Sequence, residues 1–166
     1  MELKLIDKST ADTLALIETL DDVKATKLPE KGWSALQVLE HIVLVDNSVL
    51  ALLLKPRVAN LELPKEHFGA EKLRGILIDT RSTSKIESPE AFHPRGLFKN
   101  LNEVKKAFEK IRNHFKNVIE SGELVLDGAQ FKHPRLGEMT VRDWLNFIAL
   151  HNERHLEQIK QLELSK

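Results

Sequence analysis

A helix-start signal recurs along this chain and constrains its fold more than any other feature. At three places a hydroxyl side chain is followed three residues later by an acid or an amide, which is the pattern of a capping box. These pairs are Ser9 with Asp12, Ser34 with Gln37, and Thr140 with Asp143. A fourth start, Asn100 with Glu103, precedes apolar residues at helical spacing that end near Gly122. We therefore predict helices over residues 9–25, 34–54, 100–121 and 140–162.

The long stretch between the second and third predicted helices, residues 55–99, is rich in helix breakers. It contains Pro56, Pro64, Gly69, Gly75, Pro89, Pro94 and Gly96. We predict an irregular crossover there, with a short helical turn near residues 71–78. No segment has a convincing strand pattern, because the apolar run 124–126 is too short to found a sheet. Four amphipathic helices with one long crossover predict an all-α four-helix bundle, in a single domain over residues 1–166.

Charge and cysteine content exclude several classes of function. Lys plus Arg and Asp plus Glu both number 25, so the formal net charge is zero, and there is no cysteine. We expect no nucleic-acid partner and no basic membrane-binding face, since both need a cationic excess. Disulfides, Cys-based zinc sites and a cysteine nucleophile are also excluded. The N-terminus lacks a signal-peptide pattern, and the apolar stretch 36–54 is interrupted by Glu40, His41 and Asp46. We therefore expect a cytoplasmic protein without a membrane span.

Three of the seven histidines lie on helix faces that should point into the bundle. On the last helix, His151 and His155 lie within about 20° of Trp144 on the apolar face, one turn apart. On the second helix, His41 shares its face with Val38. A single inward histidine is more often a hydrogen-bonded core residue than a ligand. Two buried imidazoles one turn apart need two polar partners, however, and one metal ion would satisfy both. Spacing alone leaves the two interpretations about evenly matched.

The axial positions of the same histidines depend on how the helices are connected. His41 lies roughly 10 Å from the start of its helix, and the midpoint of His151 and His155 lies roughly 13 Å from the end of theirs. The two levels agree to within about 3 Å if these helices are antiparallel and differ by about 9 Å if they are parallel. A long crossover between the second and third helices makes them antiparallel. We therefore predict a down-up-up-down bundle.

These residues match the motifs of a known family. The matching pattern is Trp33-Ser34 before His41, then His133-Pro134 with Gly137, Thr140 and Trp144, and finally His151-Asn-Glu-Arg-His155 with Gln158. It resembles the DinB-like (DinB/YfiT) superfamily over the second and fourth helices and the turn before the fourth. The resemblance implies a down-up-up-down four-helix bundle that holds a divalent metal ion, commonly zinc or nickel. Its three histidine ligands correspond here to His41, His151 and His155.

The resemblance also implies a range of activities. Characterised relatives include S-transferases that use bacillithiol or mycothiol and a maleylpyruvate isomerase, and other relatives are named as metal-dependent hydrolases. Three neutral imidazoles leave at least one position on the metal open to water or substrate. Asn152 stands where a zincin has its glutamate, and Glu153 is expected to face solvent. We therefore expect an external nucleophile, a low-molecular-weight thiol or water, that the metal itself activates.

Three polar side chains are candidates for orienting the ligands. Helical wheels place Gln37 and Ser48 beside His41, and Gln158 follows His155 by about one turn. The crossover adds basic residues that could receive an acidic cosubstrate: Arg57, Lys65, Arg74, Arg81, Lys85, Arg95 and Lys99. The other four histidines, at positions 67, 93, 114 and 133, are expected to be structural or exposed.

Two classes of function remain open at this point. The first is a metal-dependent S-transferase or hydrolase that acts on a small molecule. The second is a non-catalytic metal-bound bundle that serves as a binding or assembly module. An open metal position favours the first class, and a fourth protein ligand that closes the site favours the second. A small-molecule substrate, with a low-molecular-weight thiol among the choices, is the expected partner, and a homodimer is compatible with the sequence.

Overall fold

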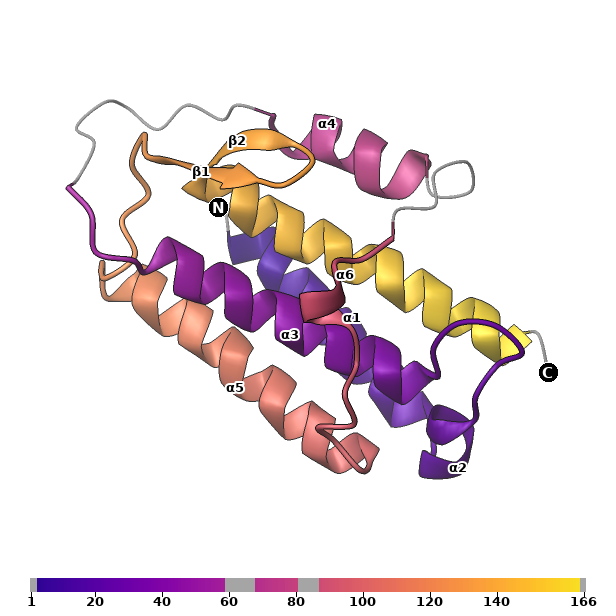
Figure 1. The fold of residues 1–166 in the computed structure, drawn as a ribbon. Helices are drawn as coiled ribbons and strands as arrows, with labels where there is room; N and C mark the ends of the chain where they lie inside the picture. The colour runs from indigo at the N-terminus through magenta and orange to yellow at the C-terminus, as the bar shows by residue number, and fades with distance from the viewer. Residues whose placement is uncertain (1–2, 59–67, 81–86, 165–166) are drawn as a thin grey trace.

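The computed structural model describes residues 3–58, 68–80 and 87–164. Its four long helices are α1 (Leu3–Thr19), α3 (Ala35–Leu53), α5 (Leu101–Glu120) and α6 (Val141–Leu164). Both α1 and α3 pack against α5 and α6, so the four helices form a closed ring. Helices α3 and α5 run in one direction, and α1 and α6 run in the other (Figure 1). The predicted four-helix bundle with its down-up-up-down order is confirmed.

Three of the four predicted helix starts are used as the sequence indicates. Ser34 and Gln37 form a complete capping box at the start of α3. The side chain of Asn100 accepts a hydrogen bond from the amide of Glu103 at 2.9 Å, which caps α5. At α6, the Thr140 hydroxyl and the Asp143 carboxylate accept each other's backbone amides at 3.2 and 3.1 Å. These bonds satisfy amides that have no partner within their own helix.

The fourth predicted start, at Ser9, is wrong. Helix α1 begins at Leu3, and Ser9 is buried inside it, where its hydroxyl donates to the carbonyl of Ile6 at 3.0 Å. The predicted segment 9–25 is also two helices, because Asp21 caps a separate α2 (Asp22–Thr26) by accepting from the amide of Lys24 at 2.8 Å. A serine inside a helix bonds to a carbonyl of the preceding turn, so a serine followed by an acid does not always mark a start.

The expectation that the chain has no strands is also wrong. Strands β1 (Gln130–His133) and β2 (Gly137–Thr140) form an antiparallel hairpin beside the start of α6. The indole Nε1 of Trp144 on α6 donates to the carbonyl of Phe131 at 3.1 Å, and Met139 is buried against the core. Four-residue strands are too short to give a readable alternation, and this hairpin depends on its contacts with α6.

The described parts of the crossover pack first against α6 and then against α3. A helix α4 (Ala70–Arg74) continues into one π-helical turn, η1 (Gly75–Asp79), and both pack against α6. This agrees with the short helical turn predicted near residues 71–78. Arg154 on α6 donates to the carbonyl of Leu77 at 2.8 Å. A 3₁₀ turn, η2 (Glu90–Phe92), then lies against α3.

The apolar core has two halves, and a buried polar cluster around Arg112 lies at their boundary. One half gathers around Phe115 and Ile148, and the other around Phe108 and Ile159. By length and composition α3 is apolar enough to cross a membrane, but 67% of that stretch is buried inside the bundle. Its apolar character is therefore accounted for by its central place in the core.

Candidate metal site

Three histidine side chains meet at the boundary between α3 and α6. The Nε2 atom of His151 lies 3.3 Å from Nε2 of His41 and 3.1 Å from Nε2 of His155. The ligand atoms of all three lie within 4.8 Å of one another. His41 is buried, whereas His151 and His155 are partly exposed. The structure thus brings together the three histidines that the sequence places on inward faces at one level.

Two of the three separations between these nitrogens match those around a single divalent ion. Imidazole nitrogens bind zinc at about 2.0–2.1 Å, so two ligands of a tetrahedral ion lie about 3.3 Å apart. The two Nε2 separations of 3.3 and 3.1 Å agree with that value. The three side chains are therefore within reach of one metal ion.

Hydrogen bonds on the opposite ring atoms fix two of the imidazoles. Nδ1 of His41 lies 2.8 Å from the carbonyl of Phe92, and Nδ1 of His155 lies 2.8 Å from Oε1 of Gln158. A proton on each Nδ1 leaves the lone pair on Nε2, directed at the shared centre, as metal ligation requires. Nδ1 of His151 is buried and has no hydrogen-bond partner among the described residues. The ring of His151 is instead stacked on Phe147, with centroids 5.4 Å apart.

The surroundings favour the neutral form of His41 and His151. Burial lowers the pKa of His41, although the bond to the Phe92 carbonyl opposes this effect. Burial also lowers the pKa of His151 well below 6.5, and the neighbouring charges of His155 and His41 add to the shift. A metal ion must displace protons from its ligands, so lowered pKa values reduce that competition near neutral pH.

Comparisons with known proteins identify the family. The sequence profile of the DinB superfamily matches residues 5–159. The chain belongs to the DinB superfamily. It is 25% identical over 162 residues to the protein YuaE of Bacillus subtilis (strain 168), described as uncharacterized, covering 97% of this chain and 96% of that protein. The crystal structure of TT2238, described as a four-helix bundle protein, superposes with a TM-score of 0.60 at 22% identity, covering 96% of this chain and 94% of the other.

The three orienting candidates have different places in this DinB-superfamily protein. Gln158 contacts the Nδ1 of His155 directly. Gln37 is used in the capping box, where its side-chain oxygen accepts from the amide of Ser34 at 2.9 Å. Ser48 is exposed and lies seven residues after His41, about 10 Å further along α3. Of the three, Gln158 has the contact that an orienting partner needs.

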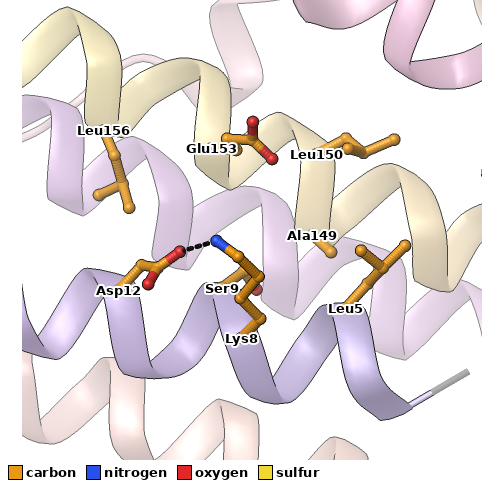
Figure 2. A pocket seen from close by; sticks show the side chains of 8 residues that line it. All are labelled: Leu5, Lys8, Ser9, Asp12, Ala149, Leu150, Glu153 and Leu156. Carbon is orange, nitrogen blue, oxygen red and sulfur yellow. Dashed lines mark hydrogen bonds and ion pairs between the residues drawn. The ribbon is translucent and has the colours of Figure 1, made fainter.

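The carboxylates closest in sequence to the histidines are engaged elsewhere. Glu153 forms two hydrogen bonds with Arg74 of α4, at 2.7 and 3.0 Å. It also lines a slot of about 10 Å³ between α1 and α6, which has room for about one water molecule (Figure 2). The amide of Asn152 donates to the carbonyl of Ser9 at 3.2 Å. Neither residue is placed as the general base of a zincin.

Two of the basic crossover residues are already paired, which argues against their predicted use in binding an acidic cosubstrate. Arg57 donates to Asp127 at 2.7 Å, and Arg74 is held by Glu153. Arg95 and Lys99 are exposed. Lys65, Arg81 and Lys85 lie outside the described residues.

The remaining histidines behave mostly as expected. Nδ1 of His133 accepts the amides of Arg135 and Leu136 at 3.1 Å each, which stabilises the hairpin turn. His114 and His93 are exposed, and Nε2 of His93 lies 2.8 Å from the carbonyl of Ser88. His67 lies outside the described residues.

Sequence reasoning missed the role of Phe92 at the site. Its contribution is a backbone carbonyl from a segment 51 residues away, and no residue type signals such a contact. Trp33 belongs to the motif that carries the family resemblance. Its ring centroid lies 5.1 Å from that of His41 and 5.6 Å from that of His93. Trp33 therefore covers one side of the buried His41 ring.

Proposed function

We propose that this protein is a metal-dependent enzyme of the DinB superfamily that acts on a small molecule. His41, His151 and His155 would hold one divalent ion, with zinc or nickel as the best candidates. The observation that carries this proposal is the convergence of three Nε2 atoms, two of them 3.1 and 3.3 Å from the third. Two of the rings also have an acceptor on Nδ1, which supports ligation through Nε2.

The residues around the site support an open rather than a closed metal centre. Three imidazoles provide fewer ligands than a structural zinc site uses. The partial exposure of His151 and His155 supports access of a small substrate to the cluster. When bound, the metal ion would act as a Lewis acid and lower the pKa of a coordinated water or thiol.

An external nucleophile fits this site best. Glu153 is paired with Arg74, and the buried carboxylate of Glu40 accepts backbone amides, so neither is placed to take a proton from substrate. The chain contains no cysteine, so a thiolate would have to come from a small molecule. We therefore infer that the protein is a thiol S-transferase. With water in place of the thiol, the same site would hydrolyse small molecules.

Cobalt-loaded protein offers a direct test of thiol activation. Adding a simple thiol such as 2-mercaptoethanol should produce a thiolate-to-cobalt charge-transfer band in the near ultraviolet. The same protein should then show metal-dependent turnover in a panel of electrophiles and esters, and His41→Ala should abolish both signals. A cobalt spectrum that no thiol or small anion alters, together with a silent panel, would instead favour a non-catalytic binding or assembly module.

A further inference from the structure

The crossover contributes an atom to the orientation of His41. The carbonyl of Phe92 lies 2.8 Å from Nδ1 of that histidine. Phe92 ends the 3₁₀ turn η2, which is only three residues long. A turn of this length cannot hold a carbonyl in place by itself, because it has only one or two hydrogen bonds of its own. Another contact has to fix this part of the crossover on α3.

Glu40 provides such a contact. Its side chain is 1% exposed, and its two oxygens accept the amides of Arg95 at 2.6 Å and Leu97 at 3.3 Å. A buried carboxylate is costly unless it receives hydrogen bonds, and charge-assisted bonds to amides are stronger than neutral ones. Residues 95–97 are thereby held firmly against α3.

The two contacts are close together on both segments. Glu40 and His41 are consecutive residues of α3, and their partners Phe92 and Arg95 are three residues apart in the crossover. A shift of the crossover at Arg95 would therefore move the Phe92 carbonyl away from the imidazole. The carboxylate and the ring anchor the same short segment from neighbouring positions on one helix.

We propose that Glu40 is a positioning residue for the metal ligand His41 and acts through the crossover segment 92–97. It holds two amides of that segment, the segment places the Phe92 carbonyl, and the carbonyl fixes the ring of His41 with Nε2 toward the centre. This inference rests on the proposed metal site. Without the carboxylate, the His41 ring would have to be ordered again each time a metal ion binds.

Asp143 provides a matched control for the proposed positioning role of Glu40. It is also a buried carboxylate that accepts two amides of the crossover, those of Phe68 and Gly69, at 3.2 and 3.1 Å. It lies eight residues before His151 on α6, about 12 Å away along the axis. Replacing it should loosen the crossover at a distance from the histidines.

The test compares Glu40→Gln, Glu40→Asp and Asp143→Asn with the wild-type protein. Zinc affinity is measured by competition with a chelator, the cobalt d–d spectrum reports ligand geometry, and hydrogen exchange follows the amides of residues 93–97. We expect Glu40→Gln to weaken zinc binding by about tenfold or more, to alter the cobalt spectrum and to speed exchange at residues 93–97. Glu40→Asp should have a smaller effect in the same direction and covers the case that Glu40→Gln does not fold.

Asp143→Asn should lower stability and leave zinc affinity within about twofold of wild type. Zinc binding unchanged in both Glu40 variants, or weakened equally by Asp143→Asn, would overturn the positioning role while leaving the metal site intact. A wild-type protein that binds no zinc or cobalt would overturn the proposed function, and this inference with it.

Discussion

The three histidines differ in the hydrogen-bond partner of Nδ1, the ring nitrogen that faces away from the shared centre of the cluster. His41 contacts a backbone carbonyl, His155 contacts Gln158, and Nδ1 of His151 has no partner within the described part of the chain. A backbone carbonyl cannot be removed by mutation, whereas a glutamine side chain can. At the scale of single residues, substitution of Gln158 is therefore the most direct test of how a hydrogen bond orients a histidine ring at this site.

Replacing Gln158 with alanine should weaken zinc binding by about tenfold to a hundredfold, since the ring of His155 loses its partner. The loss in the unfolding free energy of the metal-free protein should be small, because Gln158 is partly exposed. Chelator competition and urea denaturation measure the two effects. Gln37→Ala is the matched control: it breaks a capping box and should cost about 1 kcal/mol of stability without changing zinc affinity. Equal zinc affinities in the two variants would contradict this assignment.

Acidification should destabilise the metal-free protein. The pKa values of His41 and His151 are lowered from 6.5 in the fold, so below that pH the unfolded chain binds protons that the folded chain does not. Their contribution to stability is complete above 6.5 and is lost as the pH falls toward the folded pKa values. Urea denaturation at about pH 7.5 and about pH 5.5 should show this loss, and His151→Gln should reduce it. Stability that rises on acidification would contradict the sign.

At the scale of secondary-structure elements, capping patterns predicted three of the four helix starts, whereas no sequence pattern predicted the two strands. Ser34, Asn100 and Thr140 each begin a helix where the sequence predicts one, because the cap and its amide partner are three residues apart in the chain. The hairpin 130–140 was not predicted, because its strands are supported by contacts with α6 and not by a local sequence pattern. Local signals predict local bonds, and elements that depend on distant contacts need the structure.

Trp144→Phe tests how the hairpin depends on α6. The substitution keeps an aromatic ring in the core but removes the donor to the Phe131 carbonyl. We expect a loss of about 1–2 kcal/mol in the unfolding free energy. Hydrogen exchange should speed up at residues 130–140 before it does so elsewhere. Unchanged protection of the hairpin amides would show that the indole bond does not hold it.

At the scale of the whole molecule, a buried polar cluster joins all four long helices. Arg112 of α5 donates to Asp46 of α3 and to the hydroxyl of Ser9 on α1, both at 2.8 Å. Asn152 of α6 donates to the hydroxyl of Thr13, also on α1. The cluster lies at the boundary between the two apolar halves of the core. Because these groups are paired only in one helix arrangement, we expect them to favour the observed order of the helices.

A double-mutant cycle on this ion pair tests that expectation. Arg112→Met alone should cost about 3–5 kcal/mol, because it leaves the Asp46 carboxylate buried without its partner. Adding Asp46→Leu should recover part of that loss. Urea denaturation of the two single variants and the double variant gives the coupling. A double variant that loses at least the sum of the single losses would contradict a coupled pair.

The sequence predicted the bundle, its helix order and the meeting of His41, His151 and His155, because periodicity fixes the face and level of a residue on its helix. It did not predict the cluster around Arg112, whose members look like ordinary surface residues when each helix is considered alone. It also did not predict the Phe92 carbonyl or the two amides bound by Glu40. Those contacts join segments about 50 residues apart or more and involve backbone atoms that every residue type provides.

Metal stoichiometry tests most directly whether His41, His151 and His155 bind one divalent ion. Protein purified without added metal is analysed for its elements, then stripped and titrated with zinc, nickel, cobalt and manganese. We predict one ion per chain in the wild type, loss of stoichiometric binding in His155→Ala, and a variant that stays folded with reduced stability. A wild-type protein with no measurable affinity for any of these ions, or a His155→Ala variant that binds as tightly as wild type, would contradict the metal site.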